Sequence, residues 1–298
     1  MSTQTGSLTS GPLPCAVPAP MQVMPYAASA PRSGTRPLAV EAPVNLVYGS
    51  VPHAVMMATP ADLEDFAYGF SLTEGIVDSA EEIRATRVEA GPDGLRLHVD
   101  LAPGRLREHL ARKRAISGRT GCGVCGIEDL AQLPRAGGRA ASEVRVALPA
   151  IARALADLDG AQRLGAETRA VHAAAWARLD GGLAAVREDV GRHNALDKLI
   201  GALMRTDTAV DAGFLVITSR CSFEMVEKAA RLGAAVIVAI SAPTSLALER
   251  ARSYGMTLCA IARADTVTVF TGAERLTDGA REHRDRVGPR DGAERHAV

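Results

Sequence analysis

Two cysteines separated by two residues, Cys122 and Cys125, are the side chains in this sequence best suited to chemistry. Gly121, Gly123 and Gly126 surround them, and three glycines in six residues disfavour both helix and strand. Because glycine also reaches positive φ readily, the pattern predicts a loop that exposes its sulfur atoms. Two such thiols can hold zinc, exchange a disulfide, or carry sulfur on a nucleophilic cysteine.

The surrounding sequence favours the nucleophilic or sulfur-carrying cysteine. A structural zinc site usually takes four ligands from two such pairs, and the sequence contains no second pair. A thioredoxin-like disulfide requires its motif at a helix start, which Gly123 and Gly126 disfavour. Both alternatives stay open, and the further residues placed to bind a metal are Cys221, Cys259, His172 and His193. The cations that would stabilise a thiolate or persulfide anion are Arg112, Lys113, Arg114 and Arg119.

The chain before the cysteine pair predicts a small α+β domain. Short strands are expected at residues 44–48 and 54–58, followed by a helix that Thr59 caps and Gly75 ends. Two further strands, at residues 84–89 and 95–99, flank a turn at residues 91–94. A basic helix at residues 105–114 then leads to the cysteine loop.

The chain after the cysteine pair predicts a three-layer α/β/α domain with a mixed sheet. A helix is expected at residues 149–158, then a hairpin of residues 169–179 and 183–187, and then a helix capped by Asn194. Continuous apolar strands then alternate with helices, which indicates buried, largely parallel pairing with helices on both faces. The expected strands are 213–218, 234–240, 257–261 and 266–270, with helices at 222–232 and 245–254.

Ligands of open α/β sheets collect beyond the carboxyl ends of the strands, where two polar turns are expected here. Each turn leads into a helix N-terminus, where free N–H groups favour a phosphate. The residues concerned are Ser219, Arg220, Ser241 and Thr244, and the alternative is that such hydroxyls only cap their helices. Arg192, His193 and Lys198 could face the same pocket; alternatively, Asp197 is a capping partner and Lys198 a solvated charge.

Composition excludes several classes of protein. The 298 residues carry a formal net charge of zero, which argues against a general nucleic-acid or membrane binder. Five scattered cysteines do not resemble a disulfide framework, so we expect a reducing cytoplasm. The expected organisation is a disordered tail (1–36), the α+β domain (37–116), the CxxC loop and linker (117–145), the α/β domain (146–277) and a charged, disordered tail (278–298).

Five motifs in order along the chain resemble the FdhD family, the formate dehydrogenase accessory sulfurtransferases. They run from about Val40 to Leu276 and so span nearly all of the expected folded chain. A lone CxxC would be a weak signal, whereas five ordered motifs are specific. The motifs are residues 56–70 with 74–76, the cysteine loop 121–126, and residues 190–198, 219–226 and 241–247.

The resemblance implies a cytoplasmic homodimeric sulfur carrier. Such proteins accept sulfur from a cysteine desulfurase as a persulfide, matched here by Cys122, with Cys125 as the assisting thiol. They pass the sulfur to the molybdenum or tungsten bis-guanine-dinucleotide cofactor (bis-molybdopterin guanine dinucleotide) of formate dehydrogenase. The resemblance also implies a cytidine-deaminase-like second domain without zinc chemistry, and phosphates held at the helix termini. It places a cofactor-contact segment at Phe270, Thr271, Gly272, Ala273, Glu274 and Arg275.

One departure from the family pattern concerns His172. The family usually has a Gly-Gly pair before this histidine, where this chain has Ala170 and Val171. This departure weakens the case for a catalytic role of His172, and whether His172 contributes stays open. Two other functions stay open, a cofactor-binding chaperone that transfers no sulfur and a zinc-stabilised binding module.

Overall fold

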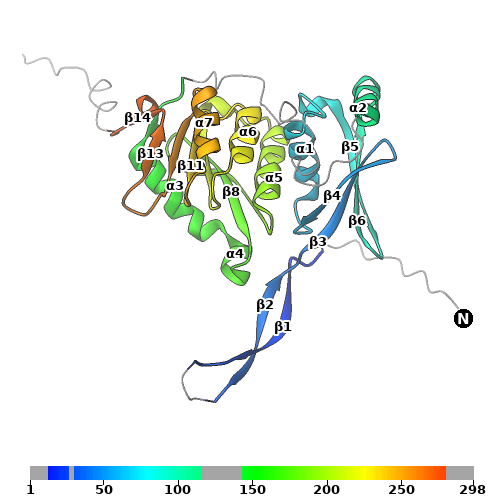
Figure 1. Cartoon of the computed structure of the whole chain (residues 1–298), viewed down its shortest axis with the longest axis horizontal. Helices are drawn as coiled ribbons and strands as arrows, with labels where there is room; N and C mark the ends of the chain where they lie inside the picture. The colour runs from blue at the N-terminus through cyan, green and yellow to red at the C-terminus, as the bar shows by residue number, and fades with distance from the viewer. Residues whose placement is uncertain (1–12, 27–29, 116–142, 280–298) are drawn as a thin grey trace, which may run out of the picture.

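The computed structural model describes residues 13–26, 30–115 and 143–279. They form two large sheets with helices packed between them, and two small sheets of two strands each: β1 (Ala16–Val23) with β2 (Arg32–Ala39), and β7 (Val146–Ala147) with β14 (Leu276–Thr277) (Figure 1). The segment that carries Cys122 and Cys125 lies outside the described residues. No helix in the described ranges is long and apolar enough to cross a membrane.

A six-stranded mixed sheet forms the larger part, in the order β13-β12-β11-β10-β8-β9. Its three central strands are parallel, whereas the β8–β9 hairpin and β13 run antiparallel to their neighbours. The parallel strands are buried throughout, as their continuous apolar sequences predict. The strands are β8 (His172–Arg178), β9 (Leu183–Asp189), β10 (Gly213–Ile217), β11 (Val236–Ala239), β12 (Thr257–Ala260) and β13 (Thr268–Thr271).

Helices cover both faces of this sheet, which confirms the predicted α/β/α layers. The crossovers from β9 to β10, β10 to β11 and β11 to β12 all progress in the same direction along the sheet, so crossovers of one hand place their three helices on one face. Another helix, α3 (Leu148–Ala161), lies on the opposite face and is followed by the short α4 (Arg163–Thr168) (Figure 1). The three helices of the first face are α5 (Arg192–Arg205), α6 (Phe223–Leu232) and α7 (Ser245–Ser253).

A four-stranded sheet, in the order β4-β3-β6-β5, forms the smaller part. The basic helix α2 (Pro103–Ala115) follows its last strand, as predicted. Helix α1 (Leu63–Thr73) packs between this sheet and α5. The order across the molecule is therefore the smaller sheet, α1, α5 and the larger sheet (Figure 1). The strands are β3 (Ala42–Tyr48), β4 (Val51–Ala58), β5 (Ile83–Gly91) and β6 (Gly94–Leu101).

The crossing of α1 and α5 depends on one glycine in each helix. A Cβ on Gly69 would lie 1.7 Å from the carbonyl oxygen of Asp197, and one on Gly201 would lie 1.8 Å from that of Asp65. Real Cβ atoms do not approach backbone so closely, so these glycines permit the two helix backbones to touch. The two sheets therefore join through an unusually close helix pair.

Two predicted helix starts were wrong because their capping residues have other partners. Helix α1 begins at Leu63, since Thr59 is buried and exchanges hydrogen bonds with Asp189 and Val190 of the larger part. Helix α5 begins at Arg192, and the Asn194 side chain donates to Met57 and Asp189 instead of capping.

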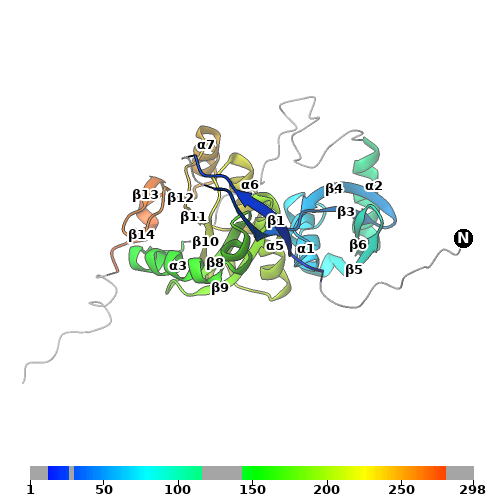
Figure 2. The same cartoon turned by 90° about the horizontal axis from the view of Figure 1, so that it is seen from below.

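The expectation of a disordered tail over residues 1–36 is wrong for the part that the structure describes. Strands β1 (Ala16–Val23) and β2 (Arg32–Ala39) pair antiparallel and project from the body as an arm (Figures 1 and 2). Val40 donates its N–H to Cys15, so odd-numbered residues of β1 form the hydrogen-bonded pairs. Pro18 and Pro20 therefore occupy positions that need no N–H donor, and the prolines do not break the ladder.

Candidate functional site

Positively charged side chains gather at the carboxyl edge of the larger sheet. The first residue of β8, His172, lies beside the end of β10 because the two strands are antiparallel and Thr218 hydrogen-bonds to Ala173. Strand β9 is parallel to β10, so the start of α5, with Arg192 and His193, lies at the same edge. The turn after β10 adds Arg220, which is exposed.

The charges of this cluster act on His172. Burial lowers the pKa of this half-buried imidazole, and the nearby charges of Arg192, His193 and Arg220 lower it further. A neutral His172 can accept a proton or a hydrogen bond at neutral pH, which a charged one cannot. The arrangement therefore combines an anion-attracting edge with a neutral imidazole.

Glu224 is a member of this edge that sequence reasoning did not assign. Its Oε2 atom lies 3.2 Å from Nε2 of His193, from a helix 31 positions further along the chain. Burial would raise the pKa of Glu224, but the hydrogen bond and charge of His193 and the charge of Arg192 outweigh burial and hold it below its usual range. Since Glu224 lies in the first turn of α6, its carboxylate opposes a phosphate at that helix terminus.

Two of the three predicted phosphate-binding hydroxyls, those of Ser219 and Thr244, already have hydrogen-bond partners within the chain. Thr244 accepts a hydrogen bond from the Ala247 N–H at 3.3 Å, so it caps α7, as the capping alternative had it. Ser219 is buried and donates to the Arg220 carbonyl. Ser241 is half-buried, and its carbonyl accepts from Ile261. The cations of this edge remain available to an anion. The buried Nε of Arg192 has no hydrogen-bond partner among the described residues.

The segment Phe270–Arg275 lies at the other end of the sheet. Thr271 pairs with Leu258 near the start of β12, whereas Ser241 hydrogen-bonds to Ile261 just beyond its end. Leu258 and Ile261 are three residues apart in extended chain, so the two positions are separated by about 10 Å along β12. The structure therefore does not bring this segment together with Arg192, His193 and Arg220 within one chain.

The larger motif around α5 serves structure instead of ligand binding. Lys198 is fully buried, 2.6 Å from Asp189, and donates to the Thr59 carbonyl, so it is neither in the pocket nor solvated. Asp197 is also buried and binds Lys228 at 2.8 Å and Thr73 of α1. Both ion pairs lie within the larger part, and each is tied to the smaller part by a hydrogen bond, to the Thr59 carbonyl in one case and from the Thr73 hydroxyl in the other.

The described cysteines have no activated thiol. Burial raises the pKa of Cys221 and of Cys259 to about 12, and both are inaccessible in the core. The half-buried Cys15 also has a raised pKa, chiefly from burial. No group of three or more potential metal ligands occurs within the described ranges. Cys122 and Cys125 lie outside those ranges, so their predicted role stays a prediction.

Comparison with known proteins gives consistent matches over most of the chain. The family model described as FdhD/NarQ matches residues 39–277. A sulfur carrier protein FdhD from Xanthomonas euvesicatoria pv. vesicatoria is 48% identical over 242 residues, which cover 81% of this chain and 86% of the relative. One of the same name from Cupriavidus necator is 45% identical over 80% of this chain and 83% of its own length.

A solved structure agrees with the fold. The crystal structure of a protein described as a formate dehydrogenase accessory protein, from Desulfotalea psychrophila, superposes with a TM-score of 0.70 at 25% identity. The match covers 89% of this chain and all of that one. The family model and the identities of 45–48% are decisive, and this chain belongs to the FdhD/NarQ family.

Proposed function

We propose that this protein is a cytoplasmic, homodimeric sulfur carrier that supplies sulfur to the cofactor of formate dehydrogenase. Cys122 would receive sulfur from a cysteine desulfurase, and the acceptor would be the molybdenum or tungsten bis-guanine-dinucleotide cofactor. The observation that carries the proposal is the gathering of Arg192, His193 and Arg220 at one sheet edge, which suits the phosphates of such a nucleotide. The relatives named sulfur carriers support the sulfur chemistry.

Sulfur loading is a thiol exchange. The Cys122 thiolate attacks the terminal sulfur of the desulfurase persulfide; a new S–S bond forms on Cys122, and the desulfurase cysteine leaves as its thiolate. The high thiol pKa values of Cys221 and Cys259 support the assignment to Cys122 and Cys125, because a protonated, buried thiol cannot make this attack.

Sulfur release requires two electrons, which we assign to the second cysteine. The Cys125 thiolate attacks Sγ of Cys122, a disulfide forms between them, and the terminal sulfur leaves as hydrosulfide. A cellular dithiol would then reduce the disulfide. In this scheme the sulfane sulfur is reduced and the two cysteines are oxidised, so the step balances.

The cofactor would be the substrate of this transfer. The cationic edge fits an anionic nucleotide tail, since Arg192 has a buried, unpartnered Nε and Arg220 is exposed. Phe270–Arg275 lies about 10 Å away along β12, so we propose that this segment contacts a different part of the same large molecule. His172, held neutral, would accept a proton or hydrogen bond near the bound anion.

Mass spectrometry of the intact protein tests the proposal directly. After incubation with a cysteine desulfurase and cysteine, the wild-type protein should gain the mass of one sulfur atom, and Cys122→Ala should not. Cys15→Ala is the matched control, because it removes a half-buried thiol from the arm, and it should load like wild type. Absence of added sulfur on both Cys122 and Cys125 in the wild type would leave a cofactor chaperone as the better function.

A further inference from the structure

The arm of β1 and β2 presents one face with several exposed apolar side chains, which stay accessible although helix α4 contacts β2. Register places the odd-numbered residues of β1 on the same face as the even-numbered residues of β2. A two-stranded ribbon alone is at best marginally stable in water, so such a face calls for a cover. The exposed apolar residues on it are Val17, Met21, Val23 and Leu38, each between 38% and 50% accessible.

The same face of the arm is positively charged. Arg36 pairs opposite Ala19, and Arg32 opposite Val23, so both guanidinium groups lie among the apolar side chains. No acidic residue precedes Glu41 in the whole sequence. The surface that covers this arm must therefore be apolar and carry negative charge, and two arms packed face to face would bring like charges together.

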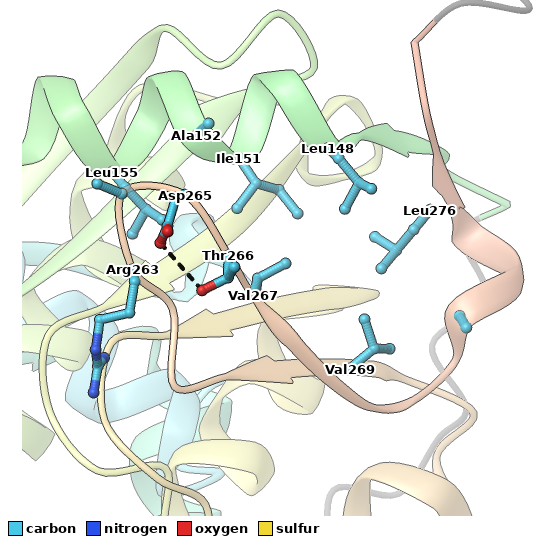
Figure 3. Close-up of a pocket in the computed structure, with 12 residues that line it drawn as sticks. Leu148, Ile151, Ala152, Leu155, Arg263, Asp265, Thr266, Val267, Val269 and Leu276 are labelled. Carbon is cyan, nitrogen blue, oxygen red and sulfur yellow. Dashed lines mark hydrogen bonds between the residues drawn. The ribbon is translucent and has the colours of Figure 1, made fainter.

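An apolar groove lies on the face of the larger sheet that helix α3 covers. This groove of about 410 Å³ runs between α3 and the edge strand β13, and Figure 3 shows Ile151, Leu155, Val267 and Val269 converging on it. Its apolar lining does not suit a phosphate, and its volume accommodates two or three side chains the size of valine, leucine or methionine.

The rim of the groove has the complementary charge. Asp265 lies exposed on the rim and has no ion-pair partner among the described residues. Arg263, the only cation in the lining, directs its guanidinium away from the groove in Figure 3 and donates to the carbonyls of Ile240 and Ala262. The groove is therefore apolar with an unopposed carboxylate, as the arm requires.

We infer that the arm of one protomer docks into the α3–β13 groove of a second copy of this chain. The eight arm residues on this face and the twelve groove residues reach the lower end of the roughly 20 to 30 residues a side found in stable interfaces. A two-fold axis makes the exchange reciprocal, so each protomer gives one arm and receives one. All of the arm except Ala39 precedes the region that the family model matches, residues 39–277.

This inference rests on the homodimer of the proposed function and is tested by the dissociation constant of the dimer in sedimentation equilibrium of the full chain. Leu38→Asp, on the apolar face, should raise that constant at least tenfold. Gln22→Asp adds the same charge to the opposite face of the arm and should leave it within about twofold. Equal effects of the two variants would overturn the inference while leaving the homodimer intact.

A charge exchange identifies the groove and controls for unfolding of the arm. Arg36→Asp and Asp265→Arg should each weaken the dimer, and the two together should recover most of the lost affinity. No recovery would place the arm elsewhere and overturn the docking site. A monomeric wild type at 100 µM, taken as about the highest working concentration, would overturn both the docking and the dimer. Sulfur loading of Cys122, measured on the same samples, tests the carrier function separately.

Discussion

Replacing Gly201 by alanine should separate the two halves of this molecule. The new Cβ would lie 1.8 Å from the Asp65 carbonyl oxygen, and an ordinary contact begins near 3.4 Å. The helices α1 and α5 must therefore move apart by about 1.6 Å. Backbone is the obstacle here, so no side chain can rotate away to relieve the contact.

The displacement also weakens buried polar contacts between the helices. Asp197 of α5 accepts a 2.8 Å hydrogen bond from Thr73 of α1, and a shift of this size breaks it. Overpacking costs about 1–3 kcal/mol and an unmade buried hydrogen bond costs a similar amount. Alanine returns about 1 kcal/mol through its better helix propensity. The expected net loss in the free energy of unfolding is about 3 kcal/mol.

Urea unfolding followed by far-ultraviolet circular dichroism measures this loss. Gly160→Ala is the matched control, because it makes the same change in helix α3 where no atom lies within 4 Å of the new Cβ. The control should be unchanged or up to about 1 kcal/mol more stable. If Gly201→Ala proved as stable as Gly160→Ala, the argument from the close helix crossing would be refuted.

Three further outcomes follow from the buried charges and the cationic edge. Lys198→Met should destabilise the protein by about 3 kcal/mol in the same assay, since it leaves Asp189 buried without its cation, and adding Asp189→Asn should recover part of the loss. The His172 imidazole, followed by NMR, should titrate below 6.5; because its folded pKa is lowered, its stability contribution is present above pH 6.5 and declines as the pH falls below that value. An unshifted pKa would contradict the cluster. Arg220→Gln should weaken binding of guanosine diphosphate, the nucleotide probe, about fivefold to tenfold by calorimetry, whereas Arg252→Gln on the exposed end of α7 should not.

The alternation of apolar strands and helices predicted the larger sheet because that pattern is local. Strands β10, β11 and β12 and the helices between them all lie within a few residues of their expected positions. The contacts that decide side-chain roles are not local. Lys198 reaches Thr59 across 139 positions, so a residue that suggested a phosphate ligand became the centre of a buried joint.

The arm was missed for a different physical reason. Prolines usually indicate an interrupted strand, but Pro18 and Pro20 are two residues apart and so share the positions that need no N–H donor. Amino-acid composition alone does not show whether prolines fall on hydrogen-bonded or non-hydrogen-bonded positions of a strand. Likewise, the pairing of His193 with Glu224 could have been suspected from their places in two helix starts, but not located without the sheet order.

The two core thiols, Cys221 and Cys259, provide a built-in probe of how this protein opens. A thiol-specific reagent reacts with the thiolate, and both groups are fully buried and carry pKa values of about 12. Cys259 lies in β12, and Cys221 bridges to Pro243 between the turns that follow β10 and β11. The slow phase of thiol labelling at neutral pH therefore measures opening of the central sheet itself, in the wild-type sequence and without an added label.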